Sequence, residues 1–136
     1  MRRTKYLPPY TDSGRTTFPA RARPGVYVIK KDGRLRYIGF SRSDVYKALY
    51  RHFQSWNDRS RPDPRVVYMQ RAGITVRVIY TDTPAQAGRL ERALIVRFQP
   101  PDNPTQYLDL QTTAADDALM DRAALAEWAP VEDVPF

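Results

Sequence analysis

The side chains of this chain best suited to chemistry are two tyrosines and one glutamate. Tyr27 and Tyr37 stand ten residues apart within the segment 25–53, and Glu91 lies much further along. A lone carboxylate is a poor metal site by itself, but Mg²⁺ keeps several waters and accepts one or two carboxylates together with substrate phosphate oxygens. A tyrosine, whose ordinary pKa is about 10, acts as a base near neutral pH only if a nearby cation lowers that pKa.

Glu91 interrupts the pattern of a helix predicted over residues 84–98. At about 100° per residue, one apolar stripe of that helix holds Ala87, Leu90, Leu94 and Phe98. Glu91 projects within this stripe, and a carboxylate on the buried side of a helix is costly unless it is paired, hydrogen-bonded or bound to a metal. A salt bridge to one of the many arginines and a divalent-metal site are both open interpretations.

The two tyrosines belong to a predicted β-hairpin. Two runs rich in Val, Ile and Tyr flank Asp32 and Gly33, which are typical turn residues. A three-residue loop, 31–33, would place Tyr27 directly opposite Tyr37 on one face of the ribbon. A two-residue loop would shift the register by one and put the rings on opposite faces, so the predicted site depends on the longer loop.

Helices and a third strand are predicted around this hairpin. Helical spacing, caps and breakers indicate helices at about 45–56, 84–98 and 114–128, and β-branched density indicates a strand at 74–80. A polar loop covers 57–64, and 65–70 is either a short helix or irregular. His52 lies on the inward stripe of the first helix, where it is a core residue, a hydrogen-bonding support or a catalytic base. Tyr46, Tyr50 and Trp56 of that helix either pack or stack on bases.

The charge of the chain is unevenly distributed. Of 136 residues with a net charge of +7, residues 1–114 hold 21 Lys and Arg against 9 Asp and Glu, whereas residues 115–136 hold 1 against 6. A basic, arginine-rich body suits a polyanionic partner such as nucleic acid, although a solvated surface accounts for the same composition. The proline-rich residues 1–23 are expected to form an extended basic arm that packs on the domain or contacts a ligand backbone.

Several classes of protein are excluded by composition. The chain has no cysteine, which excludes disulfides and thiolate catalysis, and His52 is its single histidine. No apolar run approaches the roughly 20 residues of a membrane span, and the first residues lack the apolar core of a signal peptide. The protein is therefore expected to have no membrane partner and to stay in the cytoplasm.

Four features in order resemble the GIY-YIG nuclease superfamily: Gly25-Val26-Tyr27, Tyr37-Ile38-Gly39, Glu91, and Asn103 after two prolines. The stretch LERALIVRFQPPDN, residues 90–103, is similar to the nuclease module of bacterial excision-repair enzymes. The resemblance covers residues 24–105, which leaves the arm 1–23 and an acidic helix and tail, 106–136, outside it. It implies an α/β (α+β) fold with a small three-stranded antiparallel sheet flanked by helices.

The resemblance also implies an activity, namely hydrolysis of DNA phosphodiester bonds with one Mg²⁺ or Mn²⁺ ion. Tyr27 would activate or orient the attacking water, Tyr37 would hydrogen-bond to the water or the phosphate, and Glu91 would hold the metal. Asn103, with Gly39 and His52, would position these groups. This assignment agrees with what phosphoryl transfer requires, namely an activated water, a cation on the developing charge and a positioned phosphate.

One position departs from the family pattern. The family has a phosphate-clamping arginine on the first helix, about ten residues after its second tyrosine, where this chain has Lys47 or Ala48. We hypothesise that Arg51 reaches the phosphate from the next turn, with Arg36 and Arg42 as substitutes. Arg36, Arg42 and Lys47 are also candidate nucleic-acid contacts, and a DNA-bound protein of this kind would be associated with the nucleoid.

Three functions remain open on the sequence. The first is a metal-dependent DNA endonuclease with Tyr27, Tyr37, Arg51 and Glu91 as catalytic residues. The second is a GIY-YIG-fold nucleic-acid-binding module that has lost catalysis together with the arginine. The third is a subunit whose acidic tail, residues 115–136, docks on a basic partner or covers its own basic cleft.

Overall fold

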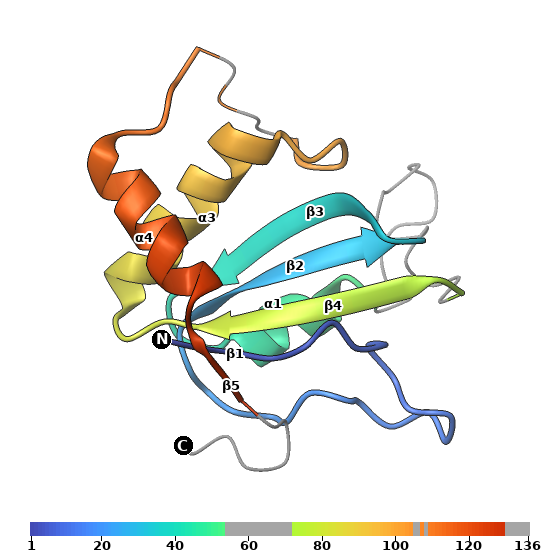
Figure 1. The fold of residues 1–136 in the computed structure, drawn as a ribbon. Helices are drawn as coiled ribbons and strands as arrows, with labels where there is room; N and C mark the ends of the chain where they lie inside the picture. The colour runs from blue at the N-terminus through green and yellow to red at the C-terminus, as the bar shows by residue number, and fades with distance from the viewer. Residues whose placement is uncertain (54–71, 105–106, 108, 130–136) are drawn as a thin grey trace.

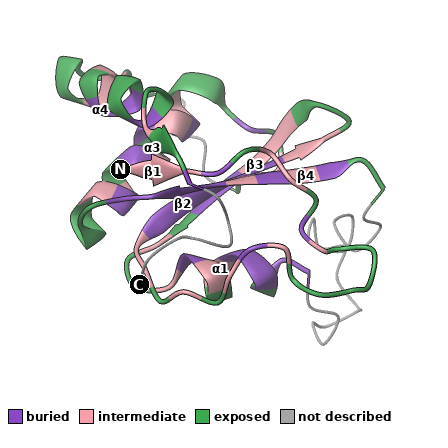
Figure 2. Cartoon of the chain, turned by 60° about the horizontal axis from the view of Figure 1, so that its bottom comes forward, coloured by how far each residue is buried: buried purple, intermediate pink, exposed green. Residues whose placement is uncertain are grey.

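The computed structural model describes residues 1–53, 72–104, 107 and 109–129. The described part belongs to the α+β class and contains a five-stranded sheet with strand order β3-β2-β4-β1-β5. The strands are β1 (Arg2–Arg3), β2 (Gly25–Lys31), β3 (Arg34–Ser41), β4 (Ile74–Tyr80) and β5 (Glu127–Trp128). The helices are α1 (Val45–Arg51), α3 (Pro84–Phe98) and α4 (Ala114–Ala124). Figure 2 shows α1 on one side of the sheet and α3 with α4 on the other.

The expected three-stranded antiparallel sheet is only the centre of the observed one. Strands β3, β2 and β4 are antiparallel neighbours, as the resemblance implied. Beyond them β1 pairs antiparallel with β4, and β5 pairs parallel with β1, so the sheet is mixed and has five strands. The two additional strands have two residues each, which is too short for an alternating apolar pattern to reveal them.

The hairpin register differs from the expected one. Its turn has two residues, Asp32 and Gly33, and both have positive φ, at 51° and 77°, as tight hairpin turns require. A bulge then shifts the pairing, because Lys30 pairs with Leu35 but Ile29 pairs with Tyr37. The extra residue, Arg36, moves Tyr37 back to the face of Tyr27. Tyr27 therefore pairs with Gly39, and Tyr37 is its diagonal neighbour.

The N-terminal segment packs on the domain as part of the sheet. After β1, the Thr4 N–H donates to the Val78 carbonyl at 2.9 Å, and Leu7 pairs with Val76 in both directions at 2.8 and 2.9 Å. Phe18 is 1% exposed and belongs to the core on the α1 face. Of the two roles expected for the arm, the described residues show the packing role.

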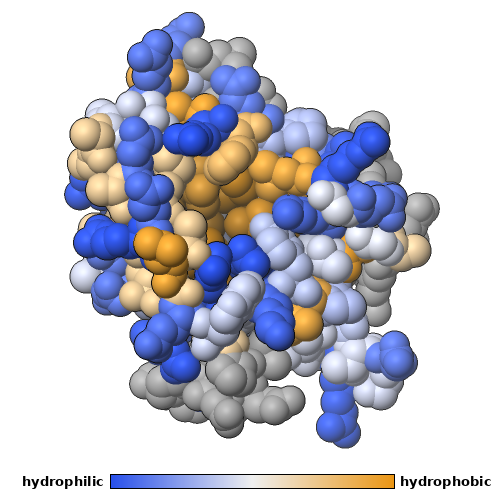
Figure 3. Space-filling model, viewed as in Figure 1, coloured by the Kyte–Doolittle hydropathy of each residue, from blue (hydrophilic) through white to orange (hydrophobic). Residues whose placement is uncertain are grey.

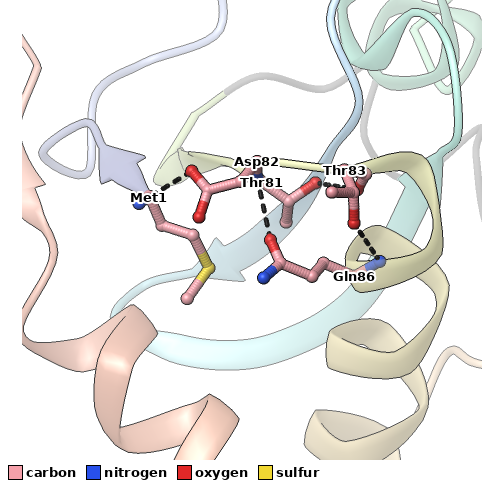
Figure 4. Close-up of polar contacts among 5 residues, drawn as sticks. All are labelled: Met1, Thr81, Asp82, Thr83 and Gln86. Atoms are coloured by element: carbon pink, nitrogen blue, oxygen red, sulfur yellow. Dashed lines mark hydrogen bonds and ion pairs between the residues drawn. The ribbon is translucent and has the colours of Figure 1, made fainter.

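The start of α3 is fixed by residues 82–86 and by the N-terminal ammonium group (Figure 4). Thr83 is the N-cap, and its hydroxyl accepts from the Gln86 N–H at 3.2 Å, while the Gln86 side-chain oxygen accepts from the Asp82 N–H at 2.9 Å. The Met1 ammonium lies 3.1 Å from the Asp82 carboxylate. The Thr83 hydroxyl thereby satisfies a donor of the first turn, as expected of an N-cap threonine.

Two predicted helices are shorter than expected. Helix α1 ends at Arg51, with His52 as its C-cap, so the prediction was wrong at His52 and Phe53. Residues 54–56 of the predicted helix lie outside the described residues, as do the loop 57–64 and the segment 65–70. The last helix was expected to reach Trp128 but ends at Ala124. Leu125 is 85% exposed, and Trp128 lies in β5 opposite Arg3. The residues after α4 instead pair with β1, where the Ala129 N–H donates to the Arg3 carbonyl. This pairing requires extended backbone, so residues 127–128 cannot continue the helix.

Each face of the sheet has its own apolar core. On the α1 face the core includes Tyr27, Ile29, Val45, Leu49 and Val76. On the α3 and α4 face it includes Val26, Val28, Ile38, Leu90 and Leu119. The alternation of residues 26–29 between these cores follows from the two-residue period of a strand. No helix of the described ranges has the length and apolarity to cross a membrane.

Candidate functional site

Three aromatic side chains predicted for the site lie together on the α1 face. The Tyr27 and Tyr37 rings are stacked, with centroids 6.0 Å apart and an interplanar angle of 28°. The His52 ring lies 4.4 Å from the Tyr37 centroid and 5.4 Å from that of Tyr27. Strands β2 and β3 supply the tyrosines, and the C-cap of α1 supplies the histidine. Tyr27 and His52 are buried, whereas Tyr37 is half-buried. Of the three rings, the Tyr37 phenol is therefore the most open to solvent.

Gly39 provides the space that the Tyr27 ring occupies. A Cβ atom at position 39 would lie 2.3 Å from both Cζ and the hydroxyl oxygen of Tyr27. The phenol therefore crosses its paired residue and carries its hydroxyl from β2 over β3, the outer strand of the sheet. Any side chain at position 39 would have to move the Tyr27 ring. This close contact explains why a glycine occupies the position.

Asn103 binds the outer edge of β3 between the motif residues. Its Oδ1 accepts from the Ile38 N–H at 3.0 Å, and its Nδ2 donates to the Ile38 carbonyl at 2.8 Å. Asn103 is buried, and these two bonds satisfy backbone groups that an edge strand otherwise leaves unpaired. The amide thereby fixes the strand between Tyr37 and Gly39.

Asp102 extends this attachment to the bulge. Its carboxylate makes a two-point contact with the Arg36 guanidinium, at 3.1 Å from Nε and 2.8 Å from Nη2. Its backbone N–H donates to the Arg36 carbonyl at 3.0 Å. The loop that follows α3 is therefore held against β3 at the Arg36 side chain, the Arg36 carbonyl and the Ile38 backbone. Arg36, a predicted phosphate contact, has its guanidinium engaged within the protein.

Glu91 is a half-buried carboxylate on α3. Burial raises its pKa to about 7, because the neutral form is favoured away from water. Within the described ranges, no cation lies at ion-pair distance from Glu91 and no group hydrogen-bonds to it. The salt bridge left open by the sequence is therefore absent from this part of the chain.

The helix that carries Glu91 covers the face of the sheet opposite the tyrosines. Its buried residues are Ala87, Leu90, Ala93 and Ile95, and these pack against β2 and β3. The predicted stripe was wrong at Phe98, which is 57% exposed. The structure thus brings Tyr27, Tyr37 and His52 together on one face of the sheet. Glu91 lies in the helical layer on the other face, and the outer strand β3 separates it from the tyrosines.

The position of Gly88 locates this part of α3 relative to β3. A Cβ at Gly88 would lie 3.5 Å from the Phe40 ring and 3.9 Å from the Arg42 guanidinium. Glu91 follows Gly88 by three residues, which is about one helical turn. Because its guanidinium is close to Gly88, Arg42 lies over the helical turn that precedes Glu91. The Arg42 side chain is exposed.

The other predicted cations lie elsewhere. Lys47 and Arg51 are exposed on α1, in its first and last turns, and Ala48 is half-buried against the core. Two features of the site escaped the sequence analysis, namely the Arg36–Asp102 pair and the approach of Arg42 to α3. The charge of Asp102, directly before Asn103, was a usable signal for the first, whereas nothing in the spacing indicated the second.

No protein-family model, curated protein or solved structure matches the chain.

Proposed function

We propose that this protein is a metal-dependent endonuclease of the GIY-YIG type that hydrolyses DNA phosphodiester bonds. The observation that carries the proposal is the contact of Tyr27 with Tyr37 and of both rings with His52. The Tyr27 phenol occupies the space that a side chain at Gly39 would need. Two phenol rings next to an imidazole ring carry donors and acceptors that can position a water molecule.

Glu91 fits the role of the single metal ligand from the protein. The described part of the chain contains no group of three or more His, Asp or Glu residues that could form a closed metal site. A half-buried carboxylate that has no partner among the described residues suits Mg²⁺ or Mn²⁺, which would complete its coordination with waters and phosphate oxygens. When bound, this ion would offset negative charge on the phosphate and lower the pKa of a coordinated water.

The protein residues then divide the remaining work. Tyr27 and Tyr37 orient the attacking water and the phosphate, and His52 supports the Tyr37 ring. Asn103 acts as a positioning residue because it fixes the strand between Tyr37 and Gly39. Arg42, whose guanidinium lies near the turn before Glu91, is a candidate to stabilise the phosphate together with the originally expected Arg51.

The test is cleavage of single- and double-stranded DNA with Mg²⁺, with Mn²⁺ and with EDTA. We expect cleavage with either metal, none with EDTA, and a loss of at least about 100-fold for Glu91→Ala. Glu127→Ala is the matched control, because Glu127 is exposed in β5. This variant should cleave DNA like the wild type. Wild-type protein that binds DNA but cleaves neither form with either metal would refute the proposal.

That outcome would favour the second candidate, a nucleic-acid-binding module without catalysis. The observation behind this candidate is Ala48, which is half-buried at a position where the family pattern has an arginine. Such a module would retain DNA affinity in EDTA and would be unaffected by Glu91→Ala. Titration of labelled DNA by fluorescence anisotropy with and without Mg²⁺ separates the two candidates.

The acidic segment contacts its own domain. Asp117 of α4 lies 3.7 Å from Arg97 of α3, so a regulatory self-contact is a third possibility. Deletion of residues 115–136 is a poor test, since α4 contributes buried Leu119, Met120 and Ala123 to the core. Asp117→Asn is the better variant, and unchanged DNA affinity and cleavage would exclude regulation through this ion pair.

A further inference from the structure

A cavity of about 520 Å³ lies on the α3 and α4 face of the sheet. Figure 1 shows that the two helices cover one end of this face, while the strands continue beyond them toward the hairpin turn. The apolar wall of the cavity is formed by Val28, Leu35, Ile38, Leu94, Phe98 and Met120. Figure 3 shows the corresponding hydrophobic hollow in the middle of the molecular surface, bordered by hydrophilic side chains. A concave apolar site of this size is typical of small-molecule pockets.

Four cations also line the cavity, and one of them is Arg97 of α3. The other three, Arg3, Lys30 and Arg77, come from β1, β2 and β4 and lie on the same face as Val28 and Ile79, by the strand registers. Within the described ranges, none of the three forms an ion pair with a carboxylate. Three positive charges without an acidic partner favour an anion at this end of the cavity.

Aromatic rings hold these cations in place. Lys30 Nζ lies 4.2 Å and Arg77 Cζ 4.3 Å from the Tyr6 ring centroid, and the Trp128 ring contacts both Arg77 and Arg3. Burial lowers the pKa of Arg77, because the charged form is disfavoured away from water. Cation–π contacts fix a charge without neutralising it, so the group remains available to a ligand.

The acidic residues of the cavity lie on the opposite wall. Asp117 and Asp121 both belong to α4, and Asp117 is near Arg97 at 3.7 Å. Arg3, Lys30 and Arg77 belong to the sheet wall, with the apolar surface beside them. The cavity therefore has a positive end and an apolar body, and the carboxylates of α4 would repel an anionic group from the helical side.

We propose that this cavity binds an anionic amphiphile, a molecule with an alkyl or aryl body and a carboxylate or phosphate head. The head would contact Lys30 and Arg77, and the body would cover Val28, Ile38 and Leu94. Nucleic acid suits the apolar part less well, because its bases and phosphates would lose hydrogen bonds to water there. The cavity is distinct from the proposed nuclease site, since none of Tyr27, Tyr37 and Glu91 lines it.

Isothermal titration calorimetry with the full chain in EDTA tests the ligand class. Dodecyl phosphate and dodecanoate, below their micelle concentrations, should bind with one site each. Dodecyltrimethylammonium and inorganic phosphate should bind at least tenfold more weakly, because one lacks the anionic head and the other lacks the body. Affinity should rise about three- to fourfold per added CH₂ from octyl to decyl phosphate. Absence of binding by both dodecyl anions, or equal binding of the cationic amphiphile, would overturn the proposal.

Neighbouring lysines on opposite faces of β2 provide a matched pair of variants. Lys30 lines the cavity and Lys31 does not, as expected from strand alternation. Lys30→Gln should weaken dodecyl phosphate binding at least fivefold, whereas Lys31→Gln should leave it unchanged. Equal effects of the two substitutions would reject the assigned head-group site.

The apolar wall is tested separately by Leu94→Glu. This variant should abolish dodecyl phosphate binding while its urea midpoint shows that it is folded. If it does not fold, Leu35→Asn at the half-buried edge strand is the substitute, with a loss of at least fivefold expected. Full affinity in a folded wall variant would refute the placement of the body.

Discussion

The phenol ring of Tyr27 lies directly over Gly39, its paired residue on the neighbouring strand, at a distance that leaves no room for a Cβ atom. This contact joins the two halves of the tyrosine motif. It explains in steric terms why a glycine follows Tyr37 by two residues, and it aims the Tyr27 hydroxyl across the outer strand of the sheet.

Gly39→Ala should therefore displace Tyr27. A Cβ 2.3 Å from the ring atoms should reduce the free energy of unfolding by about 1–3 kcal/mol, as overpacking does. DNA cleavage should fall about 100-fold in protein that is still folded, because the displaced phenol no longer orients the water. Urea denaturation and a plasmid-nicking assay measure the two effects.

Gly88→Ala is the control for that substitution. Its Cβ would have no neighbour closer than 3.5 Å, and alanine is favoured over glycine within a helix by up to about 1 kcal/mol. We expect unchanged or higher stability and unchanged cleavage. If the two variants behave alike, the close approach at Gly39 has no functional role.

Asn103→Ala should destabilise the edge of the sheet. The substitution leaves both the N–H and the carbonyl of Ile38 without their partner, and we expect a loss of about 2 kcal/mol or more in the free energy of unfolding. Hydrogen exchange at the Ile38 amide should become faster. Asp109→Ala, at an exposed position, should change stability by less than about 0.5 kcal/mol. An unchanged Ile38 exchange rate would contradict this role of the amide.

Glu91 should make the metal-free protein less stable as the pH rises. Its pKa is raised from 4.5 to about 7 in the folded state, so the native state holds a proton that the unfolded state has lost. Stability should therefore fall between about pH 4.5 and pH 7 and level off above pH 7. Glu91→Gln removes this dependence, and its advantage over the wild type at pH 8 should be about 1–2 kcal/mol after solvent screening is allowed for.

Urea midpoints measured in EDTA from pH 4.5 to pH 8 test this expectation. A difference between wild type and Glu91→Gln that stays constant with pH would contradict the assigned titration. Addition of Mg²⁺ at pH 8 should stabilise the wild type and not the variant, since only the native carboxylate binds the ion.

The two candidate phosphate-binding arginines can be ranked by alanine substitution. Arg42 lies over the helical turn before Glu91, whereas Arg51 is exposed at the end of a helix that packs on the opposite face of the sheet. We expect Arg42→Ala to lower cleavage about 100-fold and Arg51→Ala to lower it less than about threefold. Single-turnover kinetics with saturating enzyme measure the cleavage step, and the reverse ranking would return the phosphate role to Arg51.

Much of this protein follows from local sequence. The residues of β2, β3 and β4, the Thr83 cap of α3 and the unusual position of Glu91 were all predictable, because periodicity and capping depend on neighbours a few residues away. The shared face of Tyr27 and Tyr37 was predicted too, but for a different reason, since the turn has two residues and the bulge at Arg36 restores the register.

The tertiary structure decided what depends on distant parts of the chain. Strand β1 acquires its partners from residues about 80 and 125 positions away, and Arg36 with Ile38 is bound by Asp102 and Asn103. No local pattern encodes such pairings, because each partner satisfies its hydrogen bonds only once the sheet has formed. The residue types for the chemistry were thus set by the sequence, whereas the layer in which each one lies was decided by long-range packing.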